Sequence, residues 1–211
     1  MKPAGPEAGL PARIFIDAQA FRRLKLYIDL CPSEVGGLGT VEPIGPDLLV
    51  TDIFLIRQRA SNTDTELDPE AVAEHLLHIL QEGRDPAALR LWWHSHADGS
   101  IFWSDTDEET IASLHIDQLI SIVGNKRHEF RCRLDRFSPR RLTFDGIHLL
   151  PIHDDSPEDE DRLWKETLVE LQEKVTLIRR EVSMVPELFF DSSGSVEIVI
   201  PFDEQEPPQR H

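Results

Sequence analysis

An apolar run that ends in two histidines constrains this chain more than any other feature. Residues 89–93 (LRLWW) are apolar except for one arginine and lead directly into His94, Ser95 and His96. Such a run is typical of a buried strand, in which side chains alternate between the two faces. His94 and His96 would therefore share one face, with a spacing that a tetrahedral zinc ion can use.

A carboxylate in the next segment offers a third ligand. Seven residues separate His96 from Ser104, which has the character of a helix N-cap, and Asp107 falls in the first turn of that helix. Two imidazoles and one carboxylate would leave a fourth zinc position open to water. Each half also has a simpler interpretation, because Ser104 and Asp107 match a helix capping box and a histidine pair can be a satisfied polar rim.

The combined pattern, HSH followed by seven residues, serine, two residues and aspartate, resembles the JAMM signature of the JAB/MPN metallopeptidases. This family includes zinc-dependent deubiquitinases and their prokaryotic relatives, and its signature also has a glutamate on an upstream strand. Glu34 fits that position because a glycine-rich segment, 35–39, follows it. The resemblance covers about residues 12–150.

The resemblance implies a role for each of these residues. His94, His96 and Asp107 would bind one Zn²⁺ ion per chain, and Glu34 would serve as general base toward the bound water and later as proton donor. Ser104 would donate to the oxyanion of the transition state, where such a donor is worth on the order of 3 kcal/mol. The alternative for Glu34 is an ordinary solvated glutamate near a turn.

One position departs from the family pattern. The family usually has proline after the second histidine, whereas this chain has Ala97. Because proline shapes a loop and ligates nothing, the departure bears on the rigidity of the loop and leaves the metal ligands untouched.

Other metal sites fit the sequence less well. Asp98 begins the HxHxDH pattern of metallo-β-lactamase-like hydrolases, but Gly99 stands in place of its last histidine. Zinc deaminases need a closely spaced cysteine pair, whereas Cys31 and Cys132 lie far apart, and we expect both to be packing residues. The facial triad of non-haem iron oxygenases has the same ligand types, but Glu34 favours hydrolysis by zinc.

The remaining patterns predict an α/β protein with the JAB/MPN (cytidine-deaminase-like) fold, a mixed β-sheet flanked by helices with a long C-terminal helix. The expected strands are 13–17, 35–44, 48–57, 89–93, 118–123, 130–137, 141–150 and 196–200, the expected helices are 18–30, 68–82, 105–112 and 157–181, and 60–67 is expected to be a loop. In helix 68–82, Val72, Leu76, Ile79 and Leu80 are expected to point inward. The apolar stripe of helix 157–181 could cover the sheet, a partner or a second copy.

Four segments are expected along the chain. Residues 1–11 would form a flexible N-terminus and residues 12–153 the catalytic domain. An acidic linker and the long helix would follow over 154–182, and a C-terminal extension with an acidic tail over 183–211.

Charge and composition limit the kinds of partner and the cellular location that we expect for this chain. The formal net charge of −17 argues against a nucleic-acid partner, and the arginine-rich segment 126–141 is expected to present an exposed basic face. No apolar run is long enough to cross a membrane and the first residues lack the pattern of a signal peptide, so we expect a cytoplasmic protein with free thiols.

These expectations lead to one function and two alternatives. The chain would hydrolyse a peptide or isopeptide bond at the C-terminus of a ubiquitin-like protein, with activating (E1-like) and conjugating (E2-like) enzymes as candidate partners. One alternative is a non-catalytic MPN scaffold. The other is a hydrolase that processes a sulfur-carrier protein or a small amide conjugate.

Overall fold

The computed structural model describes residues 13–114, 116–153, 160–178, 187–190 and 196–199. The chain divides into two compact units, Met1–Ile178 and Arg179–His211. The second unit contains an antiparallel hairpin of β12 (Glu187–Phe190) and β13 (Val196–Val199), so the strand expected near 196–200 is confirmed. The expected flexible N-terminus at 1–11 lies outside the described residues.

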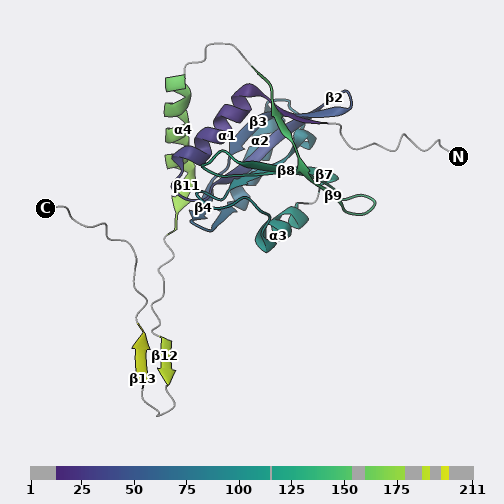
Figure 1. The fold of residues 1–211 in the computed structure, drawn as a ribbon. Helices are drawn as coiled ribbons and strands as arrows, with labels where there is room; N and C mark the ends of the chain where they lie inside the picture. The colour runs from purple at the N-terminus through teal and green to yellow at the C-terminus, as the bar shows by residue number, and fades with distance from the viewer. Residues whose placement is uncertain (1–12, 115, 154–159, 179–186, 191–195, 200–211) are drawn as a thin grey trace. The chain divides into compact units, whose positions relative to one another are not determined.

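A mixed β-sheet forms the centre of the first unit (Figure 1). Its strands are β1 (Ile14–Ile16), β2 (Gly36–Ile44), β3 (Asp47–Leu55), β6 (Leu89–Ser95), β7 (Gln118–Gly124), β8 (Phe130–Arg136), β9 (Leu142–Ile147) and β10 (Leu149–Pro151). Their order in the sheet is β10-β1-β3-β2-β6-β7-β8-β9. Strand β1 is parallel to β3 and β10, and β6 is parallel to β7, while the other neighbours are antiparallel.

The segment expected to be one strand at 141–150 is two strands. Strand β9 pairs with β8 at one end of the strand order, and β10 pairs with β1 at the other end. Only His148 separates β9 from β10, so the sheet must curl until its two edges approach each other. Gly146 takes a positive φ of 70° at this crossing.

Helices cover both faces of the sheet, which confirms the α/β class. On one face, α1 (Ala18–Leu30) and α4 (Glu160–Lys174) contribute Leu24 and Leu171 to a core that includes Trp93. On the other face, α2 (Pro69–Gln81) and α3 (Asp105–Ser113) contribute Ala71 and Ile111 to a core that includes Trp92. Because neighbouring side chains of a strand point to opposite faces, His94 lies on the same face as Trp92, beneath α3.

The first two helices begin where the sequence predicts. Asp17 caps α1, since its Oδ1 accepts from the backbone N–H of Gln19 at 2.8 Å. Asp68 caps α2 in the same way and Pro69 occupies the first turn, where a missing N–H costs nothing. One expected core residue of α2 is wrong, because Leu80 is 54% exposed.

The segment 60–67 is not a loop. Strands β4 (Gln58–Ser61) and β5 (Asp64–Leu67) form an antiparallel hairpin, and β11 (Val175–Leu177) pairs parallel with β4 to complete a small sheet. The sequence does not predict this hairpin, because its polar residues lack the apolar alternation that is typical of a half-buried strand.

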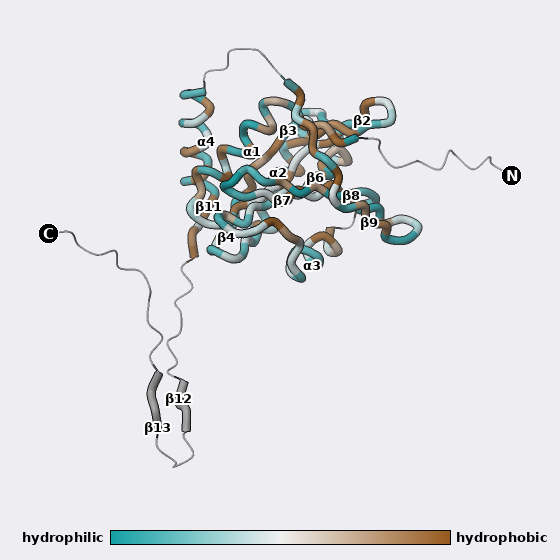
Figure 2. The backbone as a smooth tube through the Cα atoms, viewed as in Figure 1, coloured by the Kyte–Doolittle hydropathy of each residue, from teal (hydrophilic) through white to brown (hydrophobic). Residues whose placement is uncertain are grey.

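The long C-terminal helix is shorter than expected. Helix α4 ends at Lys174, and the three residues that follow form β11 instead of continuing a helix to 181. Hydrophobic and hydrophilic stretches alternate along α4 (Figure 2), and it packs on α1, where the Tyr27 hydroxyl donates to Glu170 at 2.5 Å. Leu171 of its apolar stripe therefore packs into this protein's own core, which was one of the three expected possibilities, while Trp164 of the same stripe is exposed.

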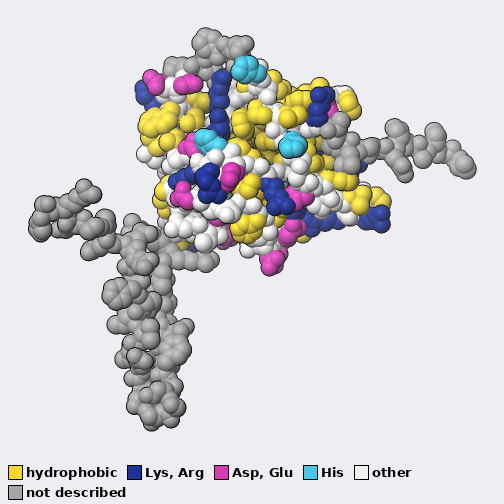
Figure 3. Space-filling view, viewed as in Figure 1, with side chains coloured by type: hydrophobic (Ala, Val, Ile, Leu, Met, Phe, Trp, Pro, Cys, Tyr) yellow, Lys and Arg dark blue, Asp and Glu magenta, His cyan; other side chains and the backbone are white. Residues whose placement is uncertain are grey.

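The arginine-rich segment presents the expected exposed basic face only in part, because Arg127, Arg140 and Arg141 are exposed whereas Arg133 is buried. Arg133 is 2% exposed and pairs with Asp135, which is fully buried. On the face of the molecule in Figure 3, basic and acidic side chains are interspersed. Both Cys31 and Cys132 are buried packing residues, as expected, and burial raises the pKa of each thiol. No described helix has the length and apolar character that a membrane crossing requires.

Candidate metal centre

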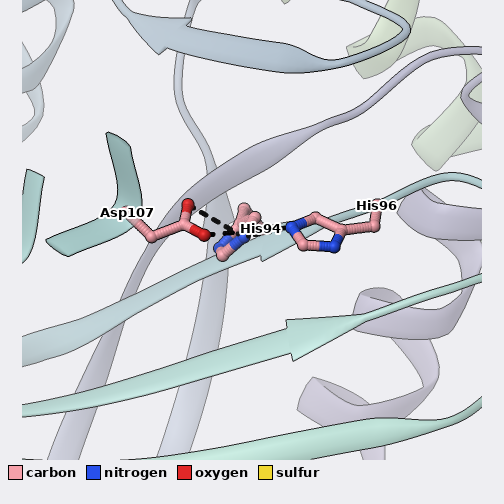
Figure 4. Close-up of side chains that lie close together, drawn as sticks. All are labelled: His94, His96 and Asp107. Atoms are coloured by element: carbon pink, nitrogen blue, oxygen red, sulfur yellow. Dashed lines mark hydrogen bonds and ion pairs between the residues drawn. The ribbon is translucent and has the colours of Figure 1, made fainter. Parts of the chain in front are cut away.

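The structure brings together the three residues expected to bind metal. His94 lies near the end of β6, His96 follows that strand, and Asp107 lies in the first turn of α3. The Nε2 atom of His94 is 3.1 Å from Nε2 of His96 and 3.2 Å from Oδ1 of Asp107. Figure 4 shows both imidazoles and the carboxylate directed toward one another.

These separations fit a bound metal ion. Zinc bonds of about 2.0–2.2 Å in tetrahedral geometry place neighbouring ligand atoms about 3.4 Å apart. Nε2 of His96 lies 3.9 Å from the other carboxylate oxygen of Asp107, Oδ2, and the three residues offer one ligand atom each within 4.8 Å of one another. The side chains are buried, with exposures of 2%, 8% and 7% for His94, His96 and Asp107. A buried His-His-Asp group of this geometry could bind a metal ion.

The protonation states also suit metal binding. The Nδ1 atom of His96 lies 2.8 Å from the carbonyl oxygen of Ser100. Because a carbonyl oxygen only accepts hydrogen bonds, Nδ1 donates to it, and Nε2 is the ring nitrogen left to bind a metal ion. Burial lowers the pKa of His94 and keeps it neutral. Burial alone would raise the pKa of Asp107, but hydrogen bonds from His94 and Ser104 bring it to about 2. The site thus offers the neutral imidazole of His94, the imidazole of His96 and the carboxylate of Asp107.

Asp107 belongs both to the capping box of α3 and to the candidate ligand set. Ser104 Oγ accepts from the backbone N–H of Asp107 at 3.1 Å, and Asp107 Oδ2 accepts from the backbone N–H of Ser104 at 2.7 Å. Asp107 Oδ1 meanwhile faces His94. One carboxylate therefore begins the helix with one oxygen and faces the site with the other, so the two interpretations of this motif are compatible.

Glu34 and Ser104 line the same cavity as the three ligands. This cavity measures about 440 Å³. Glu34 lies just before β2, not on the strand as the resemblance implied, and it is nearly buried. Its backbone is held on one side by a hydrogen bond from its N–H to the carbonyl of Ser61, at 3.0 Å. On the other side, Ser95 accepts from the N–H of Val35 at 3.1 Å.

The electrostatics of Glu34 suit a group that exchanges protons near neutral pH. Burial raises its pKa to about 8, and the negative charges of Asp107 and Asp64 add to the effect. A carboxyl group with such a pKa can both accept and return a proton under physiological conditions.

This pKa predicts how stability depends on pH in the metal-free chain. Folded Glu34 holds its proton more tightly than unfolded Glu34, so the stabilisation is complete below about pH 4.3 and is lost as the pH rises toward 8. Glu34→Gln should remove this contribution and stabilise the metal-free chain at pH 8 by on the order of 2–4 kcal/mol relative to its effect at pH 4. Urea unfolding of both proteins with a chelator, at both pH values, measures the difference. An equal effect of the substitution at both pH values would contradict the raised pKa.

Sequence reasoning missed a buried amide that supports Glu34. Gln58 on β4 is almost fully buried. Its Oε1 accepts from the N–H of Gly36 at 2.8 Å and from the Thr65 hydroxyl at 2.6 Å, while its Nε2 donates to the carbonyl of Gly36 at 2.7 Å. Gln58 therefore fastens the β4–β5 hairpin to the start of β2, beside Glu34. A lone glutamine in a polar stretch gives no sequence signal for this role.

The loop after His96 is held by a second group that the sequence did not reveal. Asn125 donates from Nδ2 to the carbonyl of Gly99 at 2.9 Å, and Arg127 donates to the carbonyl of Asp98 at 2.7 Å. The N–H of Lys126 donates to the carbonyl of Ala97 at 2.9 Å. These bonds supply the loop with support that does not depend on a proline.

The conformation of Ala97 also explains why proline is absent. Ala97 has a φ of +42°, whereas proline is fixed near −65°. Ala97→Pro should therefore destabilise the protein by on the order of 2–3 kcal/mol, while Ala97→Gly, which suits a positive φ, should change stability by less than about 1 kcal/mol. Urea unfolding of the two variants tests the loop, and a proline variant as stable as the wild type would contradict this backbone conformation.

Comparisons with known proteins do not assign this chain to a family. No protein-family model matches the chain, and no curated protein matches it. Among solved structures, the chain is similar to the solution structure of protein DSY2949 from Desulfitobacterium hafniense, with 12% identity and a TM-score of 0.49. That match covers 67% of this chain and 94% of the other. The functional conclusion therefore depends on the residues of the site itself.

Proposed function

We propose that this chain is a zinc metallopeptidase of the JAB/MPN type. One observation carries the proposal: three buried ligand atoms converge on one point, and Glu34, with a pKa suited to proton exchange, lines the same cavity. A scaffold protein has no need of this combination, because placing a buried Glu34 near the carboxylates of Asp107 and Asp64 costs free energy. Zinc is favoured over iron because a general base beside the ligands serves hydrolysis.

Each residue would have a defined task during hydrolysis. When bound, Zn²⁺ would activate a water molecule and polarise the scissile carbonyl. A carboxylate oxygen of Glu34 would take a proton from the attacking water and later deliver it to the leaving nitrogen as the C–N bond breaks. Ser104, whose hydroxyl can donate while accepting from Asp107, would stabilise the developing charge on the carbonyl oxygen.

The proposed substrate is the C-terminal tail of a ubiquitin-like protein or of its conjugate. The resemblance of the HSH and Ser-x-x-Asp motif suggests this substrate, and the surroundings of the cavity are compatible with an extended chain. Asp64 and Thr65 of β5 line the cavity, and β5 is an edge strand of the small sheet β11-β4-β5, so its outer side could pair with a tail. Phe102, which is half-exposed at the cavity, offers an apolar contact.

A cleavage assay tests this proposal. Ubiquitin and other β-grasp proteins that carry a fluorogenic amide at the C-terminal carboxyl would be incubated with zinc-loaded wild-type protein. We expect release of the fluorophore from at least one of them and reduced release when residues of its tail are replaced. Undiminished cleavage after such replacements would count against tail recognition, and no cleavage of any of them would count against the substrate class.

A further inference from the structure

A partly buried ion-pair cluster lies between strand β8 and helix α3, with Arg133 and Asp135 as its buried members. We call it the arginine brace and define it as Arg133, Asp135, Glu108 and Arg141. Arg133 donates from Nε to Asp135 at 2.8 Å, and its two terminal nitrogens both contact the carboxylate of Glu108. Arg141 bridges the same two acids, at 3.0 Å from Asp135 and 2.8 Å from Glu108. The brace thus connects strand β8 with the first turn of α3.

The brace reaches the metal ligands by two routes. Glu108 directly follows Asp107, so the forked contact from Arg133 fixes the helical turn that carries this ligand. The Arg133 guanidinium also lies 4.7 Å from the centre of the Trp103 ring, and that ring lies 6.0 Å from the ring of His94. Trp103 is itself held by a hydrogen bond from Nε1 to Asp145, at 3.2 Å.

Stability alone does not account for such a brace. Burying a charged pair costs desolvation energy that the attraction between the charges only partly repays, and apolar residues of the same volume often do as well. A charged fork does, however, fix geometry more sharply than apolar packing. Its position between α3 and the sheet suits a role in placing ligands.

We propose that Arg133 is a positioning residue that, through Glu108 and Trp103, sets Asp107 and His94 at the separation a metal ion requires. The inference rests on the proposed metal centre. It extends that centre to residues that touch neither metal nor substrate. Groups that orient metal ligands in this way typically change metal affinity by 10–100-fold when they are removed.

The test measures metal binding with Zn²⁺ and Co²⁺ alone. Affinities of the full chain are obtained by competition with a chromophoric chelator, and the visible spectrum of bound Co²⁺ reports ligand geometry. The variants are Arg133→Lys, which keeps the charge but loses the fork, and Glu108→Ala, whose half-exposed site allows folding. Glu109→Ala is the matched control, because Glu109 is exposed on the same helix.

We expect Arg133→Lys and Glu108→Ala to weaken metal binding by roughly 10-fold or more and to shift the Co²⁺ spectrum. Glu109→Ala should match the wild type. The positioning role would be overturned if folded Glu108→Ala and Arg133→Lys bound metal with wild-type affinity and gave an unchanged Co²⁺ spectrum. That result would leave the metal centre itself intact. Failure of the wild-type chain itself to bind either ion would overturn the metal centre, and the positioning role with it.

Discussion

Glu34→Gln is expected to lower the rate of amide hydrolysis by about 10²–10⁴-fold and to leave metal binding unchanged, because positioned proton transfer contributes a factor of that size. Glutamine has nearly the same shape as glutamate, so the hydrogen bond from the N–H of residue 34 to Ser61 should persist. The side chain, however, loses its ability to take a proton. Steady-state kinetics on the fluorogenic substrate and metal analysis of the same sample measure the two effects.

A matched control separates this effect from a general change of charge. Glu42 lies on β2, the strand that follows Glu34, but its side chain is exposed and does not line the cavity. Glu42→Gln should therefore keep activity within a few-fold of the wild type. Comparable rates for Glu34→Gln and wild type would remove Glu34 from the proposed mechanism.

Asp107→Asn is expected to weaken zinc binding by at least about 100-fold and to leave the fold nearly unchanged, because the removal of a ligand should exceed the loss of an outer partner. The asparagine oxygen can still accept from the N–H of Ser104, as Asp107 Oδ2 does, so the start of α3 should survive. The negative charge that favours binding of a divalent ion is lost, and a neutral amide is a weaker zinc ligand than a carboxylate. Chelator competition gives the affinity, and urea unfolding gives the stability, which should change by less than about 1 kcal/mol.

The same design distinguishes the two interpretations of the Ser104 and Asp107 motif. A helix cap alone predicts no change in metal affinity for Asp107→Asn. His96→Ala serves as the positive control, because it removes a ligand that takes no part in the capping box. Equal zinc affinity for wild type and Asp107→Asn, with His96→Ala impaired, would exclude Asp107 from the ligand set.

The elements that position the site could largely be predicted from the sequence. The apolar run before His94 is β6, and the alternation of side chains places His94 on the face that α3 covers. Asp17, Asp68 and Ser104 each cap a helix, because a short polar side chain before a helical pattern is a local signal. Local signals of this kind act over a few residues, so they survive without tertiary information.

What the sequence did not reveal depends on partners distant in the chain. Periodicity predicts an exposed face for the arginines of segment 126–141, but Arg133 is buried against Glu108, which lies 25 residues earlier in the chain. The hairpin β4–β5 was missed because the buried amide of Gln58 and the pairing with β11 stabilise it in place of an apolar face. The sequence predicts a helix where β11 lies, because the strand that pairs with β11, β4, is more than a hundred residues earlier.

Metal content tests the central claim most directly. Wild-type protein would be purified, supplied with zinc, separated from free metal and subjected to elemental analysis. We predict about one zinc per chain, held at His94, His96 and Asp107. A folded wild-type protein that retains no metal after zinc is supplied would contradict the proposed function and would favour a non-catalytic scaffold.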